Sequence, residues 1–577
     1  MDIKSKLTKI IYENLEQPAV IDEAMIRGLI TVPPEEKLGD FALPCFRLAP
    51  KGTKPVDFAA ALREKILANA SDSVLFSEIR AVGPYLNFFL NRSEVSSDVL
   101  SEVFEKGENF GRSDLGEGKT VVLDFSSPNI AKPFHIGHLC STAIGSSLSR
   151  IYDFLGYKTE NVNHIGDWGT QFGKLISAYR LWGDKETIEK DPINELLKIY
   201  VKFHQEAKEN PALEDEARHN FNLLENGDKD VTDLWKFFVE ASLKEFNRMY
   251  DLLDIHFDSY AGESFYSDKM DEVVEILTEK NLLEDSEGAK VIRFDEKSNM
   301  PPCIIIKSDG STIYATRDIA AALYRHRHYN FDKCIYVVGT PQSLHFQQVF
   351  AILGMMGYDW NTKCEHVGFG YVRFPDRALS TRNGDVVLLE DVLNESINKT
   401  YEIIKGNIEN NTTTVTMEEL PEVAQKIGVG AILFDFLKNG RERDIIFDLN
   451  RVLDFEGESG PYVQYSYARG KSVLRRAEVA YDNADFGLLT SDEEYSMIKC
   501  INKLTDVVID AANKNEPYIV TRYAIELAKT FNKFYNSCNI MKSEPELMKA
   551  RLALTSASCE VIKIALNLIG VKVVEKM

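Results

Sequence analysis

A strand, a loop and an apolar helix follow one another in residues 120–157, and no other feature constrains the fold of this chain as strongly. TVVLDFSS (residues 120–127) is a strand-like run, and LCSTAIGSSLSRIYDFLGY (residues 139–157) has apolar residues at helical spacing. KTENVNHIG (residues 158–166) predicts a second strand. This order of elements is the opening of a nucleotide-binding α/β unit.

The same kind of fold continues after a long interruption. Residues 183 to about 300 are largely helical and charged, with apolar residues at helical spacing in NELLKIYVKFHQEAKEN. Strands are expected again at residues 301–309 and 334–340, with a helix at residues 316–329 between them. The sequence therefore predicts a nucleotide-binding fold that is split by an insertion.

The two ends of the chain differ from this central part. The N-terminal region mixes helical stretches with short strands such as AVGPYLNFFL (residues 81–90), and residues 107–119, rich in Gly and charge, indicate a linker. From about residue 396 strand signals nearly vanish, and a helix that starts at Pro461 and an amphipathic tail at residues 551–570 predict an α-helical bundle. We expect three domains, at residues 1–115, 116–395 and 396–577.

Composition excludes some classes of protein. The 577 residues carry a formal net charge of −22, which argues against a non-specific nucleic-acid binder because phosphate attracts Lys and Arg. The net charge does not exclude an enzyme that acts on nucleic acid, since the attraction of a charged ligand depends on the local electrostatic field. The 8 cysteines contain no CxxC pair, which predicts reduced, mostly buried thiols and no metal site.

The sequence also bears on location. The first twenty residues, MDIKSKLTKIIYENLEQPAV, lack the apolar region and the small-residue cleavage site of a signal peptide. No stretch approaches the ~18 apolar residues of a membrane span. We therefore expect a cytoplasmic protein.

His135-Ile136-Gly137-His138 is the sharpest chemical signal, because it lies at the predicted strand-to-helix turn. Helix N-termini offer unpaired N–H groups to phosphate, and a glycine lets a nucleotide approach closely. The imidazoles can donate hydrogen bonds to oxygens as charge grows at an α-phosphate. The alternative is a pair of structural histidines near a turn, but the position directly after a strand favours phosphate chemistry.

Four blocks of sequence together resemble one family. SPNIAKPFHIGH (residues 127–138) is similar to the HIGH region of arginyl-tRNA synthetases, and NVNHIGDWGTQFG (residues 161–173) is similar to the next block of that family. YATRDIAAAL (residues 314–323) and GPYVQYSYAR (residues 460–469) match two more. With the tail, the resemblance spans essentially the whole chain.

The resemblance implies a multidomain α/β + α architecture. A class I Rossmann-type catalytic domain with a helical insertion would follow a small α/β N-terminal domain that contacts the tRNA elbow. An all-α anticodon-binding domain would come last. The implied enzyme is a monomeric ligase that uses ATP and Mg²⁺ to form arginyl-adenylate and pyrophosphate, and then esterifies the 3′ end of tRNA with release of AMP. Family members require bound tRNA before activation proceeds.

The resemblance also assigns residues to the phosphates of ATP. His135 and His138 would be catalytic, and Asn129 and Gly137 would contact ATP. The HIGH region as a whole comprises Pro128, Asn129, Ile130, Ala131, Lys132, Pro133, Phe134, His135, Ile136, Gly137 and His138.

The second class I signature, KMSKS, is degenerate here. It aligns with Ala378-Leu379-Ser380-Thr381-Arg382, so both lysines are absent. The resemblance implies that Lys132, just before HIGH, substitutes for them. Ser380 and Arg382 remain catalytic candidates, and Arg377 is a further cation. The alternative is an ordinary loop with a turn at residues 383–384.

An arginine site needs carboxylates, because a guanidinium is a planar fork of donors that pairs bidentately with them. By motif position, Asp318 would face the guanidinium and Tyr314 would flank it. Asn129 and Asp124 would hold the α-amino end, although Asp124 stands where some relatives have Glu. Gln342 would line the site. The alternative for Asp318 is a carboxylate that caps a helix.

Further contacts follow from the same resemblance. His366 and Val367 lie on a strand edge that would meet adenine through backbone groups, and His345 would lie on the nucleotide side. The helix from Pro461 combines aromatic residues for stacking with cations for phosphate, which suits single-stranded RNA loops, although a tyrosine core face beside a solvated basic face is the alternative. Its predicted tRNA contacts are Tyr462, Tyr465, Arg469, Lys471, Arg475 and Arg476.

Three other functions compete with this prediction. Small nucleotidyltransferases also use HxGH, but they are short single domains without the DWGTQFG block. A non-catalytic paralogue often loses the HIGH histidines, and here both remain. A class I synthetase for another amino acid is disfavoured by Asp318 and Tyr314, which do not suit a hydrophobic or thiol substrate.

Overall fold

The computed structural model describes residues 3–15, 21–69, 75–374, 387–481 and 483–577. The chain forms two compact units that each join segments distant in sequence. The first consists of Met1–Gly111, Arg469–Leu504 and Glu526–Ile562, and the second of Arg112–Ala468, Thr505–Ile525 and Lys563–Met577. The three consecutive domains expected from the sequence differ from this division, and their boundaries stay predictions.

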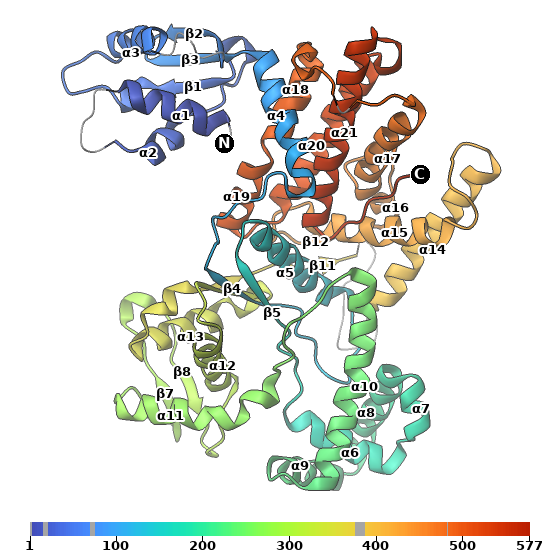
Figure 1. Ribbon diagram of the computed structural model, residues 1–577. Coiled ribbons are helices and arrows are strands. Elements are labelled where there is room, and N and C mark those ends of the chain that lie inside the picture. The colour runs from blue at the N-terminus through green and yellow to red at the C-terminus, as the bar shows by residue number, and fades with distance from the viewer. Residues whose placement is uncertain (1–2, 16–20, 70–74, 375–386, 482) are drawn as a thin grey trace. The chain divides into compact units, whose positions relative to one another are not determined.

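A small antiparallel sheet with helices forms the N-terminal part of the first unit (Figure 1). Its elements are α1 (Ile3–Asn14), α2 (Glu23–Leu29), β1 (Phe41–Pro44), α3 (Pro55–Asn69), β2 (Phe76–Val82) and β3 (Tyr85–Leu90). Strand β3 lies between β1 and β2, and Phe88 joins Leu7, Ile11 and Leu62 in the buried core. The run at residues 81–90 is therefore the end of one strand and the whole of the next, because Gly83, with φ of 56°, turns the chain between them.

The rest of the first unit is helical. It contains α4 (Arg92–Lys106), α18 (Asp492–Asn502), and parts of α17 (Gly460–Ala477), α20 (Tyr518–Ser537) and α21 (Pro545–Leu568). Helix α18 begins with a capping box between Ser491 and Glu494. The buried Glu494 carboxylate also accepts a hydrogen bond of 2.7 Å from Nε of Arg551 on α21. A buried carboxylate needs such partners, since burial without them is costly.

A parallel sheet is the centre of the second unit. Its strands are β4 (Thr120–Asp124), β5 (Lys158–Val162), β9 (Lys333–Val337) and β10 (Cys364–Val367). They lie in the order β10-β9-β4-β5, and every neighbouring pair is parallel. Strand β4 ends at Asp124, whereas the sequence predicts a strand to residue 127. Ser126 and Ser127 have positive φ and end the extended run.

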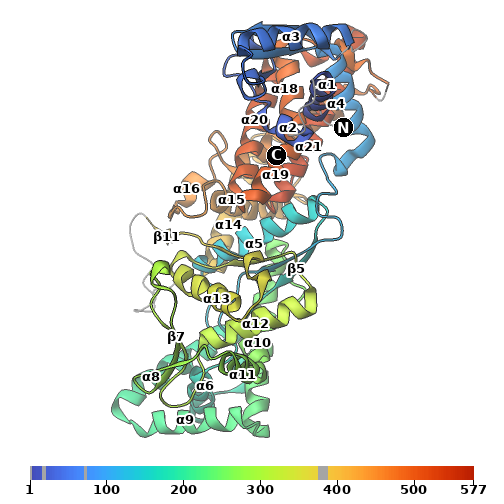
Figure 2. The ribbon, with the colours of Figure 1, turned by 90° about the vertical axis from the view of Figure 1, so that its left-hand side faces the viewer.

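Helices cover both faces of this sheet. Helix α5 (Ile136–Phe154) covers one face, and α12 (Tyr314–Tyr329) and α13 (Ser343–Met355) cover the other, as Figures 1 and 2 show from two sides. Each helix begins at the edge of the sheet where the strands end, because a right-handed crossover returns the chain to the start of the next strand. The first turns of α5, α12 and α13 therefore share the carboxyl edge of the sheet.

Between β5 and β9 lie the predicted insertion and a second small sheet. The elements in chain order are α6 (Thr170–Trp182), α7 (Lys185–Lys190), α8 (Pro192–Glu209), α9 (Ala212–Glu225), α10 (Lys229–Leu253), α11 (Met270–Glu279), β6 (Glu284–Ser286), β7 (Ala289–Ile292) and β8 (Cys303–Ile306). The expectation of a largely helical segment to residue 300 misses the hairpin β6–β7. Its turn residues, Glu287 and Gly288, both have positive φ, as a two-residue hairpin turn requires.

Helices dominate the remainder of the second unit. They are α14 (Leu389–Glu409), α15 (Leu420–Leu437), α16 (Leu449–Val452) and α19 (Leu504–Lys514), with a short parallel pair of β11 (Val372–Arg373) and β12 (Ile445–Ile446). The predicted multidomain α/β + α fold class is confirmed, with a parallel nucleotide-binding sheet, a small N-terminal α/β part and a helical C-terminal part.

Two expectations from the sequence can be compared directly with the structure. All 8 cysteines are free thiols and all are buried, as predicted. Among the helices in the described part of the chain, none is long and apolar enough to cross a membrane.

Candidate active site

The segment that follows β4 and includes the first turn of α5, residues 126–138 and called the HIGH loop below, has an unusual backbone. Ser126, Ser127 and Ala131 have φ values of 71°, 49° and 59°. The left-handed region is costly for residues other than glycine, and its repeated use in one loop is typical of a functional site. The loop leaves β4 beside β9, where the strand order changes direction, and open α/β sheets bind ligands at that edge.

The two histidines of this loop are held by backbone hydrogen bonds. Nδ1 of His135 accepts from the N–H of Gly137 at 3.1 Å, and Nδ1 of His138 accepts from the N–H of His135 at 3.2 Å. The rings stack with centroids 3.7 Å apart, and the His138 ring also stacks on Phe134. Because Nδ1 accepts in both rings, the hydrogen of each neutral imidazole lies on Nε2. Both side chains therefore offer an N–H donor.

Both imidazoles are neutral near pH 7. Burial lowers the pKa of His138 to about 3, with smaller contributions from His135 and Lys132. Burial also lowers the pKa of His135, and the Lys132 charge acts in the same direction. The loop can therefore stabilise a developing negative charge with oriented dipoles, and no imidazolium is needed.

Asn129 and Lys132 flank the histidines differently. Asn129 forms a β-bridge with Gly166, and a Cβ on that glycine would lie 2.3 Å from Oδ1 of Asn129. Only glycine at position 166 therefore permits this placement of Asn129. Lys132 is exposed, and in the described ranges its ammonium has no hydrogen-bond or ion-pair partner. Lys132 is therefore a cation that is available beside the HIGH histidines.

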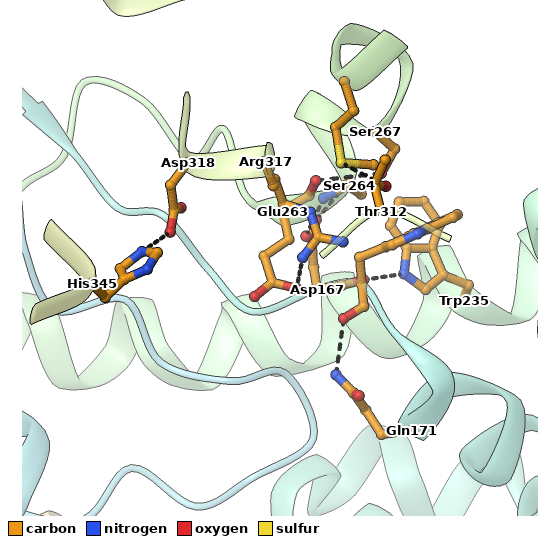
Figure 3. Close-up of polar contacts among 12 residues, drawn as sticks. Asp167, Gln171, Trp235, Glu263, Ser264, Ser267, Thr312, Arg317, Asp318 and His345 are labelled. Carbon is orange, nitrogen blue, oxygen red and sulfur yellow. Dashed lines mark hydrogen bonds and ion pairs between the residues drawn. The ribbon is translucent and has the colours of Figure 1, made fainter. Parts of the chain in front are cut away.

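Asp318, Tyr314 and His345 come together although they lie on two helices. Nε2 of His345, from α13, lies 2.5 Å from Oδ2 of Asp318 on α12, and Figure 3 shows the two side chains pointing toward each other. Tyr314, one turn before Asp318 on α12, meets the His345 ring edge-on with centroids 5.0 Å apart. Tyr314 is 62% exposed, so it can border a ligand at this place. The sequence placed His345 on the nucleotide side, whereas its contacts here are with the predicted arginine ligands.

Asp124 already has a cationic partner. Its Oδ2 lies 2.8 Å from Nη2 of Arg325, which is 1% exposed, and its Oδ1 accepts from Oγ of Ser127. Burial lowers the pKa of Arg325, but the charges of Asp124, Tyr266, Tyr336 and Cys334 together raise it well above its ordinary value. A direct contact of Asp124 with a substrate amine stays a prediction, and such a contact would have to share the carboxylate with Arg325.

Two further carboxylates belong to this region, and no role was assigned to them from the sequence. Glu263 accepts a hydrogen bond of 2.9 Å from Nη1 of Arg317, and burial raises its pKa to about 7. Both oxygens of the buried Asp167 accept from Ser264, through its N–H and its hydroxyl (Figure 3). Asp167 lies in the DWGTQFG block, so a motif could have pointed to it. Glu263 lies in no such motif.

These groups influence one another electrostatically. The charges of Asp167 and Asp318 both raise the pKa of Glu263, in addition to its burial. Burial lowers the pKa of His164, while the charges of Asp124, Asp318 and Asp167 act against that effect. We refer below to Asp124, Asp167, Glu263 and Asp318 as the acidic cluster. Arg325 and Arg317 offset part of the negative charge of this cluster, and the negative charge that remains suits a cationic substrate.

The remaining predicted ATP and arginine contacts lie at or near the carboxyl edge of the sheet. His366 and Val367 belong to β10, which is an edge strand of the sheet. Nε2 of His366 donates to the carbonyl oxygen of Val338 at 2.8 Å, so this ring is occupied by the protein itself. Gln342 precedes the first residue of α13 and is exposed.

The predicted tRNA contacts lie along α17, with different exposure. Tyr465, Arg475 and Arg476 are exposed, and Tyr462 and Lys471 are half-buried. Arg469 donates to Oδ1 of Asn532 at 2.5 Å and lies over the ring of Tyr535. We place the cations at positions 475 and 476 first among the candidates for contact with RNA.

The degenerate KMSKS segment, with Arg377, Ser380 and Arg382, lies outside the described residues. Within the described residues, no group of three or more His, Cys, Asp or Glu side chains could hold a metal ion.

Comparisons with known protein families cover most of the chain. The family model for the catalytic domain of class I (R) tRNA synthetases matches residues 99–449. The model for the DALR anticodon binding domain matches residues 463–577, and that for the arginyl tRNA synthetase N-terminal domain matches residues 3–90.

Individual relatives are similar to this chain over their full lengths. The arginine–tRNA ligase of Clostridium botulinum (strain Langeland) is 54% identical over 579 residues, which cover 100% of both chains. That of Clostridium perfringens (strain 13) is 55% identical over 573 residues and covers 99% of each.

Solved structures are similar to this chain as well. The arginyl-tRNA synthetase of Plasmodium falciparum superposes with a TM-score of 0.79 at 26% identity, covering 100% of this chain and 99% of its own. The enzyme of Thermus thermophilus has the same fold, with a TM-score of 0.81 at 22% identity and coverage of 99% and 100%. The full-length similarity at 54% identity, together with the catalytic-domain match over more than half of the residues, shows that this chain belongs to the arginyl-tRNA synthetases of class I.

Proposed function

We propose that this protein is an arginine–tRNA ligase. The α-carboxylate of L-arginine attacks the α-phosphorus of ATP, and pyrophosphate leaves with the electron pair of the broken P–O bond. The resulting arginyl-adenylate then reacts with a ribose hydroxyl at the 3′ end of tRNA, which gives the ester and AMP. The observation that carries the proposal is the placement of the HIGH loop and of Asp318 with His345 at the same carboxyl edge of one parallel sheet.

The HIGH loop would act on the phosphates. Nε2–H of His135 and of His138 is a fixed donor, because Nδ1 of each ring is occupied by a backbone N–H. Charge grows on the α-phosphate oxygens during the attack, and donors that are already oriented stabilise that charge without reorganisation. Lys132, exposed on the same loop, would meet the charge of the departing pyrophosphate.

The acidic cluster would select the amino acid. A guanidinium pairs with a carboxylate through two parallel hydrogen bonds, whereas an ammonium presents a point charge. Asp318 would supply that carboxylate, with Tyr314 and Gln342 bordering the side chain. Asn129 would hold the α-amino end, together with Asp124 where Arg325 leaves it available.

ATP would be bound as its Mg²⁺ complex. Mg²⁺ is commonly held by nucleotide phosphates and waters with few protein ligands, and there it neutralises phosphate charge. The edge strand β10, through the backbone of His366 and Val367, would receive the adenine. Each of these contacts would place the α-phosphate against the HIGH loop.

The tRNA would bind through the helical C-terminal part. Exposed Tyr465 can stack on an unpaired base, and exposed Arg475 and Arg476 can contact phosphate. The match of residues 463–577 to an anticodon-binding domain supports this assignment. We expect one protein chain to bind one tRNA, in keeping with the predicted monomer.

Aminoacylation of total tRNA with each of the twenty amino acids tests the proposal. Arginine should be charged, and lysine should not be charged at saturating tRNA. Comparable charging with lysine would refute the assignment. Pyrophosphate exchange with and without tRNA separates the proposal from a small nucleotidyltransferase, since the exchange with arginine should depend on tRNA. A protein that binds ATP and tRNA and yet charges no amino acid would be a non-catalytic paralogue.

A further inference from the structure

Among the described residues, no Lys or Arg side chain pairs with the Asp318 carboxylate. The nearest cation in sequence is Arg317, but its guanidinium turns away to Glu263, 2.9 Å from Nη1, as Figure 3 shows. The Asp318 side chain is 27% exposed, and its Oδ1 has no hydrogen-bond partner among the described residues. The carboxylate therefore keeps Oδ1 and a second lone pair of Oδ2 for a ligand, as bidentate pairing requires.

The other oxygen of this carboxylate is fixed by His345. Because a carboxylate only accepts, Nε2 of His345 must carry the hydrogen of the 2.5 Å contact with Oδ2. The His345 side chain is 11% exposed, and its ring packs against Phe346 and against the edge of Tyr314. The donor is thus part of a packed helix, α13, whereas its acceptor lies on α12.

We propose that His345 is a positioning residue for the amino-acid substrate: it holds Asp318 in the one orientation in which the carboxylate meets a planar guanidinium. This inference rests on the proposed function. Bidentate pairing requires the plane of the carboxylate to match the plane of the fork, so a freely rotating carboxylate would lose much of the preference for arginine. An ammonium makes no such geometric demand, and its affinity depends less on the carboxylate plane.

The His345 side chain also links Tyr314 to Asp318. His345 touches both, and they lie one turn apart on α12. One side chain from α13 therefore fixes the charged group and the aromatic group that would border the same ligand. The assignment moves His345 from the nucleotide side, where the sequence placed it, to the amino-acid side.

Replacement of His345 by two amides of different length tests the inference. In His345→Gln the amide nitrogen reaches the position of Nε2 and can donate to Asp318. In His345→Asn the amide nitrogen lies at the position of Nδ1 and does not reach Asp318, although the imidazole ring is lost in both variants. Equilibrium dialysis of labelled arginine and of labelled ATP against wild type, both variants and His345→Leu gives the two dissociation constants separately. Thermal unfolding of each variant checks folding.

We expect His345→Asn and His345→Leu to raise the arginine dissociation constant about tenfold or more, since hydrogen bonds to charged groups are the strong ones. His345→Gln should recover most of that loss, and the ATP dissociation constant should change less than about twofold in all three. The ratio of kcat/KM for arginine to that for lysine should fall in His345→Asn and not in His345→Gln.

Other outcomes would overturn the inference in distinguishable ways. Equal losses in the Gln and Asn variants would show that only the ring and its packing matter. A larger change for ATP than for arginine would return His345 to the nucleotide side. A wild-type protein that binds no arginine at all, with or without tRNA, would refute the proposed function itself, and the inference with it.

Discussion

The HIGH loop and the acidic cluster lie at one edge of the sheet, but they are built in different ways. The loop is one continuous segment whose donors are neutral imidazoles oriented by backbone N–H groups. The cluster takes carboxylates from β4, the loop after β5, the turn before α11 and helix α12, and each has a different partner. A site for anionic phosphate is thus formed locally, whereas a site for a cation is assembled by tertiary packing.

The difference has an electrostatic reason. Backbone N–H groups at a helix start are dipoles that every such turn provides, and here those of His135 and Gly137 orient the two imidazoles that would face phosphate. Full charges repel one another when buried together, so each carboxylate of the cluster needs its own partner. Arg325, Arg317, Ser264 and His345 supply these partners from separate elements.

The largest expected effect tests the cation side of this comparison. Asp318→Asn should weaken arginine binding by about 2–5 kcal/mol, because it removes one partner of a charge-assisted pair. The amide oxygen can still accept from His345, so the fold around α12 and α13 should remain. ATP binding should change little. Dissociation constants for both substrates provide the measurement, and equal losses for the two would point to general misfolding instead.

The next effect tests the phosphate side. His138→Ala should lower tRNA-dependent pyrophosphate exchange about 10²–10³-fold, since removal of one oriented donor from a developing oxyanion costs that much. The arginine dissociation constant should stay close to that of the wild type. His138→Gln, which keeps a donor near Nε2, should retain part of the rate. A His138→Ala enzyme with nearly full activity would give the histidine a structural role only.

A third prediction concerns the missing lysines of the KMSKS segment. Lys132→Ala should lower pyrophosphate exchange by at least about 10²-fold, because a cation has to meet the leaving group in the transition state. Ala378→Lys, added to Lys132→Ala, should recover part of the loss. Exchange at the wild-type rate in Lys132→Ala would mean that Arg377, Arg382 or the metal carries this charge.

The smallest effects should have opposite signs in the two regions. Burial lowers the pKa of His138 from 6.5 to about 3, so between these values the unfolded chain binds a proton that the folded chain does not. Burial raises the pKa of Glu263 from 4.5 to about 7, so between these values the folded chain keeps a proton that the unfolded chain has lost. His138 should therefore destabilise the fold as pH falls below 6.5, and Glu263 should destabilise it as pH rises toward 7.

Variants separate these two contributions. Midpoints of denaturant unfolding, measured across the two pH ranges for wild type, His138→Gln and Glu263→Gln, should show that each variant removes one slope and leaves the other. Each group should contribute a slope of at most about 1.4 kcal/mol per pH unit to the free energy of unfolding. The same slope in Glu263→Gln as in wild type would mean that Glu263 is ionised in the folded protein throughout this range.

The sequence predicted the strand-to-helix turn that carries the HIGH histidines, because neighbouring residues form this turn. The run from the predicted strand at residue 120 to the predicted helix near residue 139 places the HIGH histidines at a strand-to-helix turn, and the structure has β4 and α5 there. The end of β4 was predicted three residues too late, because two serines with positive φ end the strand without a glycine or asparagine to mark the turn. The hairpin of β6 and β7 was missed for another reason, because its short strands and its Glu287-Gly288 turn lie within a charged segment.

The sequence by itself determined the order of β4, α5, β5, α12 and β9, the family, and the position of Asp318 near the start of a helix. Only the tertiary structure decided what each carboxylate contacts: Asp318 with His345, Asp124 with Arg325, and Glu263 with Arg317. Helix and strand periodicities and motif spacing are properties of neighbouring residues, so they can be read along the chain. Which charges become partners depends on the packing of α12, α13 and β4 against one another, because Coulomb and hydrogen-bond energies depend on distance in space and not on separation in sequence.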